Sequence, residues 1–187
     1  MCVIVFGEEA HVAFDGLIVA YEKRVFNLIY RLIGDYDEAA DLTQDTFVAA
    51  YRAYNDFRHE CPVYTWLCRI AVNRCKNCFR ERARQRGVEG VQLDDIEQDA
   101  GFSYDSASAA PDDALQRKEL RQRIEEAIAE LPEEYRIVAV LRDLQGMSYQ
   151  DIADSADLSL DNVKVRLSRA RAMLRRKLEP YFEDQGV

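Results

Sequence analysis

The chain has 187 residues, of which 25 are basic and 34 acidic, and its formal net charge is −9. The hydrophobic fraction of 48% is normal for a soluble globular protein, and no apolar run reaches the roughly 18 residues that span a bilayer. Residues 1–10 lack the basic segment and the cleavage pattern of a signal peptide. We therefore expect a cytoplasmic protein without membrane insertion.

The acidic charge is concentrated in the middle of the chain. Residues 87–116 contain eight Asp or Glu residues and no Lys or Arg. This stretch is rich in Gly, Ser, Ala and Asp and poor in large apolar residues, a composition typical of a linker that cannot fold alone. It predicts two domains, residues 1–87 and 115–187, joined by a flexible acidic linker over residues 88–114.

The first domain is expected to be helical. Residues 14–34 carry apolar side chains at helical spacing and end at Gly34, a residue suited to a helix C-cap. Residues 35–57 begin with acidic residues that suit the N-terminus of a second helix. A short loop contains Pro62, and residues 64–86 then predict a third helix with a basic C-terminal part.

The second of these helices has two distinct sides on a helical wheel. Asp41 and Asp45 share one side, and the simplest interpretation of such a side is a solvated face. The other side is formed by Ala40, Phe47, Tyr51 and Tyr54.

The second domain is predicted to be helical as well. Residues 115–131 form a helical pattern that stops at Pro132, and residues 133–146 form another that ends at Gly146, a second C-cap candidate. No segment of useful length alternates with the period of a strand, so the predicted fold class is all-α.

A helix-turn-helix is predicted over residues 148–167. Ser148 and Asp151 have the spacing of a capping box, and small Ala153 would allow a second helix to cross closely. Ser159 is a suitable N-cap for that second helix.

The second helix of this motif predicts a nucleic-acid interface. Val163, Leu167 and Ala170 begin a narrow apolar stripe, and small residues centred on Val165 and Ser168 lie opposite. Such a face, flanked by cations, can enter a major groove while the cations meet phosphates. The alternative is a solvated basic helix, or one that binds an acidic partner. The flanking cations are Lys164, Arg166, Arg169, Arg171, Arg175, Arg176 and Lys177.

Both domains resemble those of bacterial sigma factors of the extracytoplasmic-function group. The segments DEAADLTQDTFVAAYRAYNDF and YTWLCRIAVNRCKNCFRER are similar to the family's domain two. The segments ELPEEYRIVAVLRDLQGMSYQDIA and NVKVRLSRARAMLRRKL are similar to its domain four. The resemblance implies a protein that binds core RNA polymerase, directs it to promoters and helps open the DNA.

The resemblance also implies roles for particular residues. The helix from Asp37 to Tyr54 would dock on the polymerase clamp through Asp41, Gln44 and Asp45. Residues 57–64 would capture an unstacked promoter base. Asn73 matches the family's base-pocket asparagine, whose amide can pair with a base edge. The downstream-element and melting contacts would be Phe57, Arg69, Asn73, Lys76 and Arg80. The upstream-element contacts would be Arg142, Ser159, Lys164, Val165, Ser168, Arg169 and Arg171.

Several expectations remain open. Trp66 is expected in the core, and Arg166 could brace its own domain instead of meeting DNA. Asp157 and Asp161 depart from the family pattern. Because of these two residues, a decoy that only sequesters an anti-sigma factor is one alternative function. A helix-turn-helix regulator that acts without polymerase is another. Members of the family are commonly restrained by an anti-sigma factor, so such a partner is expected here.

Five cysteines allow a metal or redox sensor as a third rival. Cys68 and Cys75 are seven residues apart on one predicted helix, about 10 Å along its axis, which is too far for one zinc ion. Only Cys75 and Cys78 could share a metal, with two further ligands from elsewhere. We predict no metal site and no cofactor. The sequence shows no nucleophile with a partner base, so we do not expect an enzyme.

Overall fold

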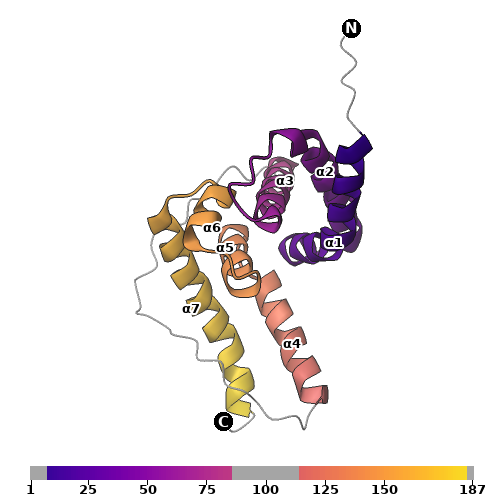
Figure 1. The fold of residues 1–187 in the computed structure, drawn as a ribbon. Helices are drawn as coiled ribbons and strands as arrows, with labels where there is room; N and C mark the ends of the chain where they lie inside the picture. Colours follow the sequence, from indigo (N-terminus) through magenta and orange to yellow (C-terminus); the bar gives the residue numbers. More distant parts are fainter. Residues whose placement is uncertain (1–7, 86–113, 185–187) are drawn as a thin grey trace. The chain divides into compact units, whose positions relative to one another are not determined.

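The computed structural model describes the backbone of residues 8–85 and 114–184. The chain divides into two compact units, Met1–Arg86 and Gly87–Val187. Every regular element in the described ranges is helical, which confirms the all-α class with two helical domains (Figure 1). Almost all of the predicted linker, and Cys2, lie outside the described residues.

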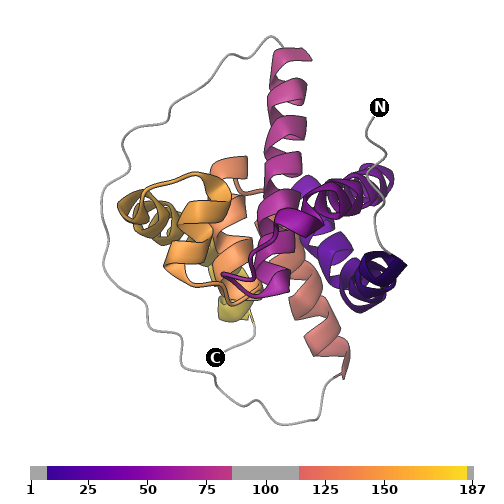
Figure 2. The same ribbon diagram turned by 45° about the horizontal axis from the view of Figure 1, so that its top comes forward.

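The first unit is a bundle of three helices. These are α1 (Glu8–Ile33), α2 (Tyr36–Ala53) and α3 (Val63–Gln85), and each packs against the other two. The last turns of α3 extend beyond the packed part of the bundle (Figure 2). The fully buried side chains of the three-helix bundle include Val25, Leu28, Ile29, Leu32, Ala39, Ala50, Leu67, Ala71 and Val72.

The turn between α1 and α2 follows the predicted cap pattern. Gly34 has a φ of +81°, and its amide donates to the carbonyl of Tyr30 at 2.8 Å. Asp35 then begins α2, because its carboxylate accepts from the amide of Glu38 at 2.9 Å. An L side chain at Gly34 would crowd the following carbonyl in this left-handed conformation.

The buried side of α2 was predicted only in part. Phe47 is buried, but the structure buries Thr43 and Thr46, which the wheel did not place on that side. Each threonine hydroxyl donates to the carbonyl four residues earlier, at 2.7 Å. Because the hydroxyl is satisfied within the helix, a threonine can face the core like an apolar residue. The other residues of the predicted side, Ala40, Tyr51 and Tyr54, are half-buried.

The second unit comprises α4 (Ala114–Ala129), α5 (Glu133–Ala139), the wider helical turn η2 (Val140–Leu144), α6 (Tyr149–Ala156) and α7 (Leu160–Asp184). Helix α7 packs against α4, α5 and α6. The stop at Pro132 and the positive φ of Gly146 occur where the sequence predicts them. Buried side chains at the centre include Leu131, Tyr135, Val138, Leu141, Ile152, Val163, Leu167 and Ala170.

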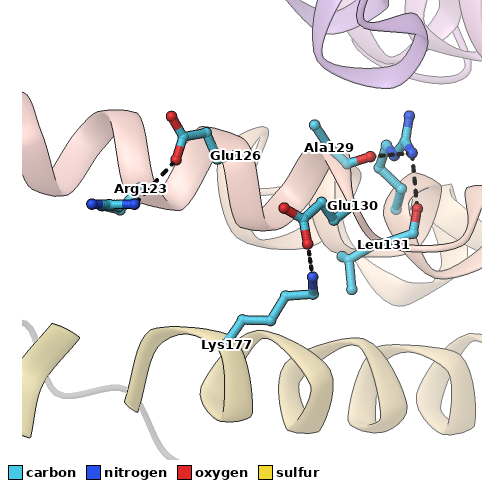
Figure 3. Close-up of polar contacts among 7 residues, drawn as sticks. Arg123, Glu126, Ala129, Glu130, Leu131 and Lys177 are labelled. Atoms are coloured by element: carbon cyan, nitrogen blue, oxygen red, sulfur yellow. Dashed lines mark hydrogen bonds and ion pairs between the residues drawn. The ribbon is translucent and has the colours of Figure 1, made fainter. Parts of the chain in front are cut away.

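Polar contacts join α4 to its neighbours. Lys177 on α7 forms an ion pair with Glu130 just beyond α4 (Figure 3). The guanidinium of Arg136 donates to the carbonyls of Ala129 and Leu131, at 2.5 and 2.9 Å. Ala129 is the last residue of α4 and Leu131 follows two residues later, so Arg136 caps the end of the helix and holds the chain that leaves it.

Two glycines of the first unit should respond oppositely to alanine. Gly16 is an exposed residue inside α1, and a Cβ there would meet no atom within 4 Å. We expect Gly16→Ala to stabilise the unit by about 0.5–1 kcal/mol and Gly34→Ala to destabilise it by about 1–2 kcal/mol. Urea unfolding followed by fluorescence of Trp66, the single tryptophan, reports on this unit. Equal shifts for both variants would contradict the cap assignment.

Candidate polymerase and nucleic-acid interfaces

One face of α2 is acidic and open to solvent. Asp41, Gln44 and Asp45 are all exposed, as the sequence predicts, and they follow the helical spacing of one side. Val48 lies one turn further along and is 49% exposed, so the face also offers an apolar group. We call these four residues the α2 surface. Carboxylates beside an apolar side chain suit a partner whose surface is basic and partly apolar.

The loop between α2 and α3 is held by aromatic rings. After the short helical turn η1 (Tyr54–Asp56), Phe57 stacks on Trp66 with centroids 4.6 Å apart and His59 packs on Phe57 at the same separation. The expected core position of Trp66 is wrong, because its side chain is only half-buried. It serves as the support on which Phe57 rests. His59 has a φ of +56°, in the left-handed region that residues other than glycine seldom adopt.

The predicted downstream contacts share one face of α3. Arg69, Asn73, Lys76 and Arg80 recur at intervals of four, three and four residues, which is the spacing of a single helix face. Asn73 and Arg80 are exposed, while Arg69 and Lys76 are half-buried. Trp66 is one turn before Arg69 and brings Phe57 to the same end of the helix. The face therefore places one amide among three cations.

A polar contact between α2 and α3 was not predicted. The carboxylate of Glu38 accepts from the Cys78 thiol at 3.1 Å and forms an ion pair with Arg82. Arg82 therefore helps to join the two helices and is less available to an outside anion than the sequence alone suggests. Cys78 and Arg82 lie 40 and 44 residues after Glu38 in the chain, so no local sequence pattern could have indicated these contacts.

The structure describes four cysteines, none of them in a disulfide, and two are buried. Burial raises the pKa of the Cys68 thiol to about 12 and that of Cys75 to about 12. Cys61 and Cys78 are half-buried. Within residues 8–85 and 114–184, no three His, Cys, Asp or Glu side chains gather into a cluster that could hold a metal ion.

This burial predicts selective alkylation. At pH 8, four units below the raised pKa values, Cys68 and Cys75 have almost no thiolate and little access to reagent. We expect iodoacetamide to label Cys61 in the native protein while both buried thiols remain unlabelled. Peptide mass spectrometry, with urea-unfolded protein as the control, measures this. Fast native labelling of Cys75 would favour the redox-sensor rival.

The helix-turn-helix forms as the sequence predicts. The Ser148 hydroxyl accepts from the Asp151 amide at 3.1 Å and caps α6. Asp157 ends α6 with a φ of +57°, the left-handed conformation that the turn requires. The Ser159 hydroxyl accepts from the Asn162 amide at 3.2 Å and caps α7. The Ser159 hydroxyl is therefore already hydrogen-bonded to its own helix. Its side chain is nevertheless exposed at the N-terminus of α7, the end of a recognition helix that contacts DNA bases.

The two sides of α7 also match the predicted wheel. Val163, Leu167 and Ala170 are buried against the unit. On the opposite side Ser168 and Ala172 are exposed, and Val165 is 40% exposed. This side is small and uncharged along its centre, which allows close approach to a surface such as the floor of a DNA groove.

Several cations beside this face have acidic partners. Lys164 pairs with Asp161 at 3.3 Å, and Arg171 pairs with Asp143 at 2.5 Å. Arg166 pairs with Glu134 on α5 at 3.2 Å, so it braces the unit, the alternative that the sequence left open. Arg142 also has internal partners, since it donates to the carbonyl of Met147 at 2.7 Å and lies over the ring of Tyr149. Arg169, half-buried on α7, completes the predicted set.

Comparison with known proteins identifies the family. The sequence profile of sigma-70 region 2 matches residues 17–85, and that of sigma-70 region 4 matches residues 121–174. The chain is 35% identical to the RNA polymerase sigma-H factor of Pseudomonas aeruginosa over 92% of its own length and 89% of the relative's. It is 34% identical to the ECF RNA polymerase sigma-E factor of Escherichia coli K12, covering 90% and 87%.

The chain belongs to the extracytoplasmic-function group of the sigma-70 family. It is a sigma factor that directs RNA polymerase to promoters. Sigma factors are not a class of enzymes. None of the helices described in either unit is both long and apolar enough to cross a membrane.

Two solved proteins have a related structure. One is RpoE of Bartonella quintana, solved with the anti-sigma factor NepR. It has a TM-score of 0.65 and 24% identity, and the alignment covers 89% of this chain and 97% of that one. The other is CnrH, solved with the cytosolic domain of CnrY, with a TM-score of 0.61, 26% identity and coverage of 91% and 90%. Region 2 corresponds to the α1–α3 bundle and region 4 to most of the second unit.

Proposed function

We propose that the sigma factor uses its two units for three separate contacts, with the α2 surface bound to core RNA polymerase. Asp41, Gln44 and Asp45 are the contacts, and exposed Val48 adds apolar area. The observation that supports this role is the exposure of all four side chains on one side of α2 while the opposite side is buried in the bundle.

The α3 face and the loop before it are proposed to bind the downstream promoter element and assist melting. Phe57 on its Trp66 support is suited to contact an unstacked base, because bases stack on aromatic rings. Asn73 offers an amide to a base edge. The neighbouring cations Arg69, Lys76 and Arg80 would meet the phosphates.

The helix-turn-helix is proposed to read the upstream element in duplex DNA. Val165 and Ser168 would face base edges, because they occupy the exposed centre of α7 near its N-terminal end. Cations beside them would bind phosphates. The remaining proposed contacts are Arg142, Ser159, Lys164, Arg169 and Arg171.

An anti-sigma factor is the proposed regulatory partner, and the cytoplasm the proposed location. The sigma factor RpoE described above was co-crystallised with the anti-sigma factor NepR, and CnrH was solved in complex with the cytosolic domain of CnrY. The net charge of −9 also limits DNA binding by the sigma factor alone, because phosphate neutralisation supplies most non-specific affinity.

Run-off transcription tests these assignments. Purified protein is mixed with core RNA polymerase and a fragmented library of its own genome, and new transcript ends are mapped. Discrete starts that require this protein are expected, and the sequences upstream of them define the promoter. Stable capture of a partner protein without any start would favour the decoy. A specific footprint without core polymerase would favour the stand-alone regulator.

A further inference from the structure

Four residues from three elements form a polar cluster beside the recognition helix. Arg142 and Asp143 lie on η2, Tyr149 is the first residue of α6, and Arg171 lies on α7. Two of them, Arg142 and Arg171, are proposed DNA contacts. Asp143 is an acid in the middle of this basic surface, and its presence there needs an explanation.

Asp143 binds one particular edge of the Arg171 guanidinium. Nε donates to Oδ2 at 3.2 Å, and Nη2 donates to Oδ1 at 2.5 Å. A guanidinium holds five N–H donors in a rigid fork. The pairing with Asp143 uses the edge formed by Nε and Nη2 and leaves the Nη1 donors outside it. Arg171 is therefore fixed in orientation and still able to bind a second acceptor.

Arg142 is also fixed in orientation, by a backbone carbonyl and by the ring of Tyr149. Its Nη1 donates to the carbonyl of Met147 at 2.7 Å, and its guanidinium carbon lies 4.8 Å from the centroid of the Tyr149 ring. The hydrogen bonds to Asp143 raise the pKa of Arg171. Asp143 follows Arg142 directly in η2, which brings the two arginines to the same part of the unit. Two oriented guanidiniums, one held by Met147 and Tyr149 and the other by Asp143, form a site suited to an anion.

We propose that Asp143 is a positioning residue, which holds Arg171 so that its Nη1 edge meets a phosphate of the DNA backbone next to Arg142. The inference rests on the proposed function of this unit as the reader of the upstream element. A phosphate fits better than a base, because Arg171 lies about three turns beyond Leu160 at 3.6 residues per turn, whereas a recognition helix reads bases with its N-terminal residues.

Asp161 provides a matched control. It too is an acid paired with a cation of α7, but the ammonium of Lys164 is a point charge with no preferred edge. The pair is also more open, with side-chain exposures of 59% and 90% against 35% and 37% for Arg171 and Asp143. Alanine at either position removes one negative charge near the DNA. If both carboxylates merely repelled phosphates, replacing either one with alanine would tighten DNA binding.

The test measures binding of the holoenzyme to its mapped promoter at several salt concentrations. Asp161→Ala should tighten binding about 2- to 5-fold, because a repulsive charge is gone. Asp143→Ala should weaken binding about 5- to 10-fold in spite of the same charge change, and the slope of log K against log salt should become shallower by up to about 1. Asp143→Glu should recover part of the loss. Tighter binding by Asp143→Ala would overturn the inference.

A double variant separates positioning from a structural effect. In an Arg171→Ala background only the repulsion by Asp143 remains, so adding Asp143→Ala should tighten binding as Asp161→Ala does. Continued weakening there would mean that Asp143 supports the fold, and the inference would fail. Wild-type holoenzyme that binds no promoter would instead overturn the proposed function, and the inference with it.

Discussion

Reversing Asp41 and Asp45 to Lys is expected to abolish transcription that depends on this sigma factor. Both carboxylates are exposed on the α2 surface, so the change should leave the bundle folded. Breaking a charge pair in a protein interface costs about 2–5 kcal/mol, so two reversals should weaken binding to core polymerase by at least about 100-fold. The affinity for core enzyme, measured with labelled protein, and the yield of run-off transcripts should fall together.

The control for this pair lies on the neighbouring helix. Asp15 and Glu22 are exposed acids of α1, and their reversal to Lys changes the net charge by the same amount. We expect this variant to bind core polymerase within a few-fold of wild type, because rim or distant charges mainly affect the rate of association. Equal losses in the two variants would mean that total charge matters and that the α2 surface has no special role.

Local patterns predicted the caps and turns of both units correctly. Gly34, Ser148 and Ser159 act on backbone groups within four residues in the chain, so the residue type and its position suffice to place them. The wheel of α7 succeeded for a similar reason. Its apolar stripe is narrow and its charged residues are numerous, so few other orientations of the helix could bury it.

Contacts between distant elements could not be predicted in this way. Asp143 and Arg171 are 28 residues apart, and the sequence offers no rule that pairs this acid with this arginine. Trp66 was misplaced because an aromatic residue at helical spacing can pack on a loop as well as in a core. Both outcomes depend on how the helices pack, which fixes partners only after the chain has folded.

These long-range pairs change the interpretation of the basic segment at the end of the chain. The sequence placed seven cations between Lys164 and Lys177 beside the proposed DNA-binding face and left open whether Arg166 braces its own domain. In the structure Arg166 and Lys177 are paired with acids of other elements and hold the unit together. Binding and bracing are thus divided among neighbouring cations of one helix. A count of positive charges therefore overestimates the number available to DNA.

Replacing Lys164 and Arg169 with Ala is expected to weaken promoter binding strongly. Both cations lie beside the exposed centre of α7, one on each edge. Losing two phosphate contacts should weaken holoenzyme binding by about 100-fold and make the salt slope shallower by about 2. Because phosphate contacts carry no sequence information, a promoter whose upstream element has been scrambled should lose affinity for the variant by a similar factor. Filter binding over a salt series measures both quantities.

The same helix supplies the comparison that makes this result specific. Arg175 and Arg176 are exposed cations further along α7, and none of the proposed contacts includes them. Their replacement by Ala removes the same charge, so any loss from long-range attraction alone will occur there too. We expect that loss to be about 2- to 5-fold, with the preference for the intact upstream element unchanged. If the two double variants lose affinity equally, the N-terminal half of α7 does not read the promoter.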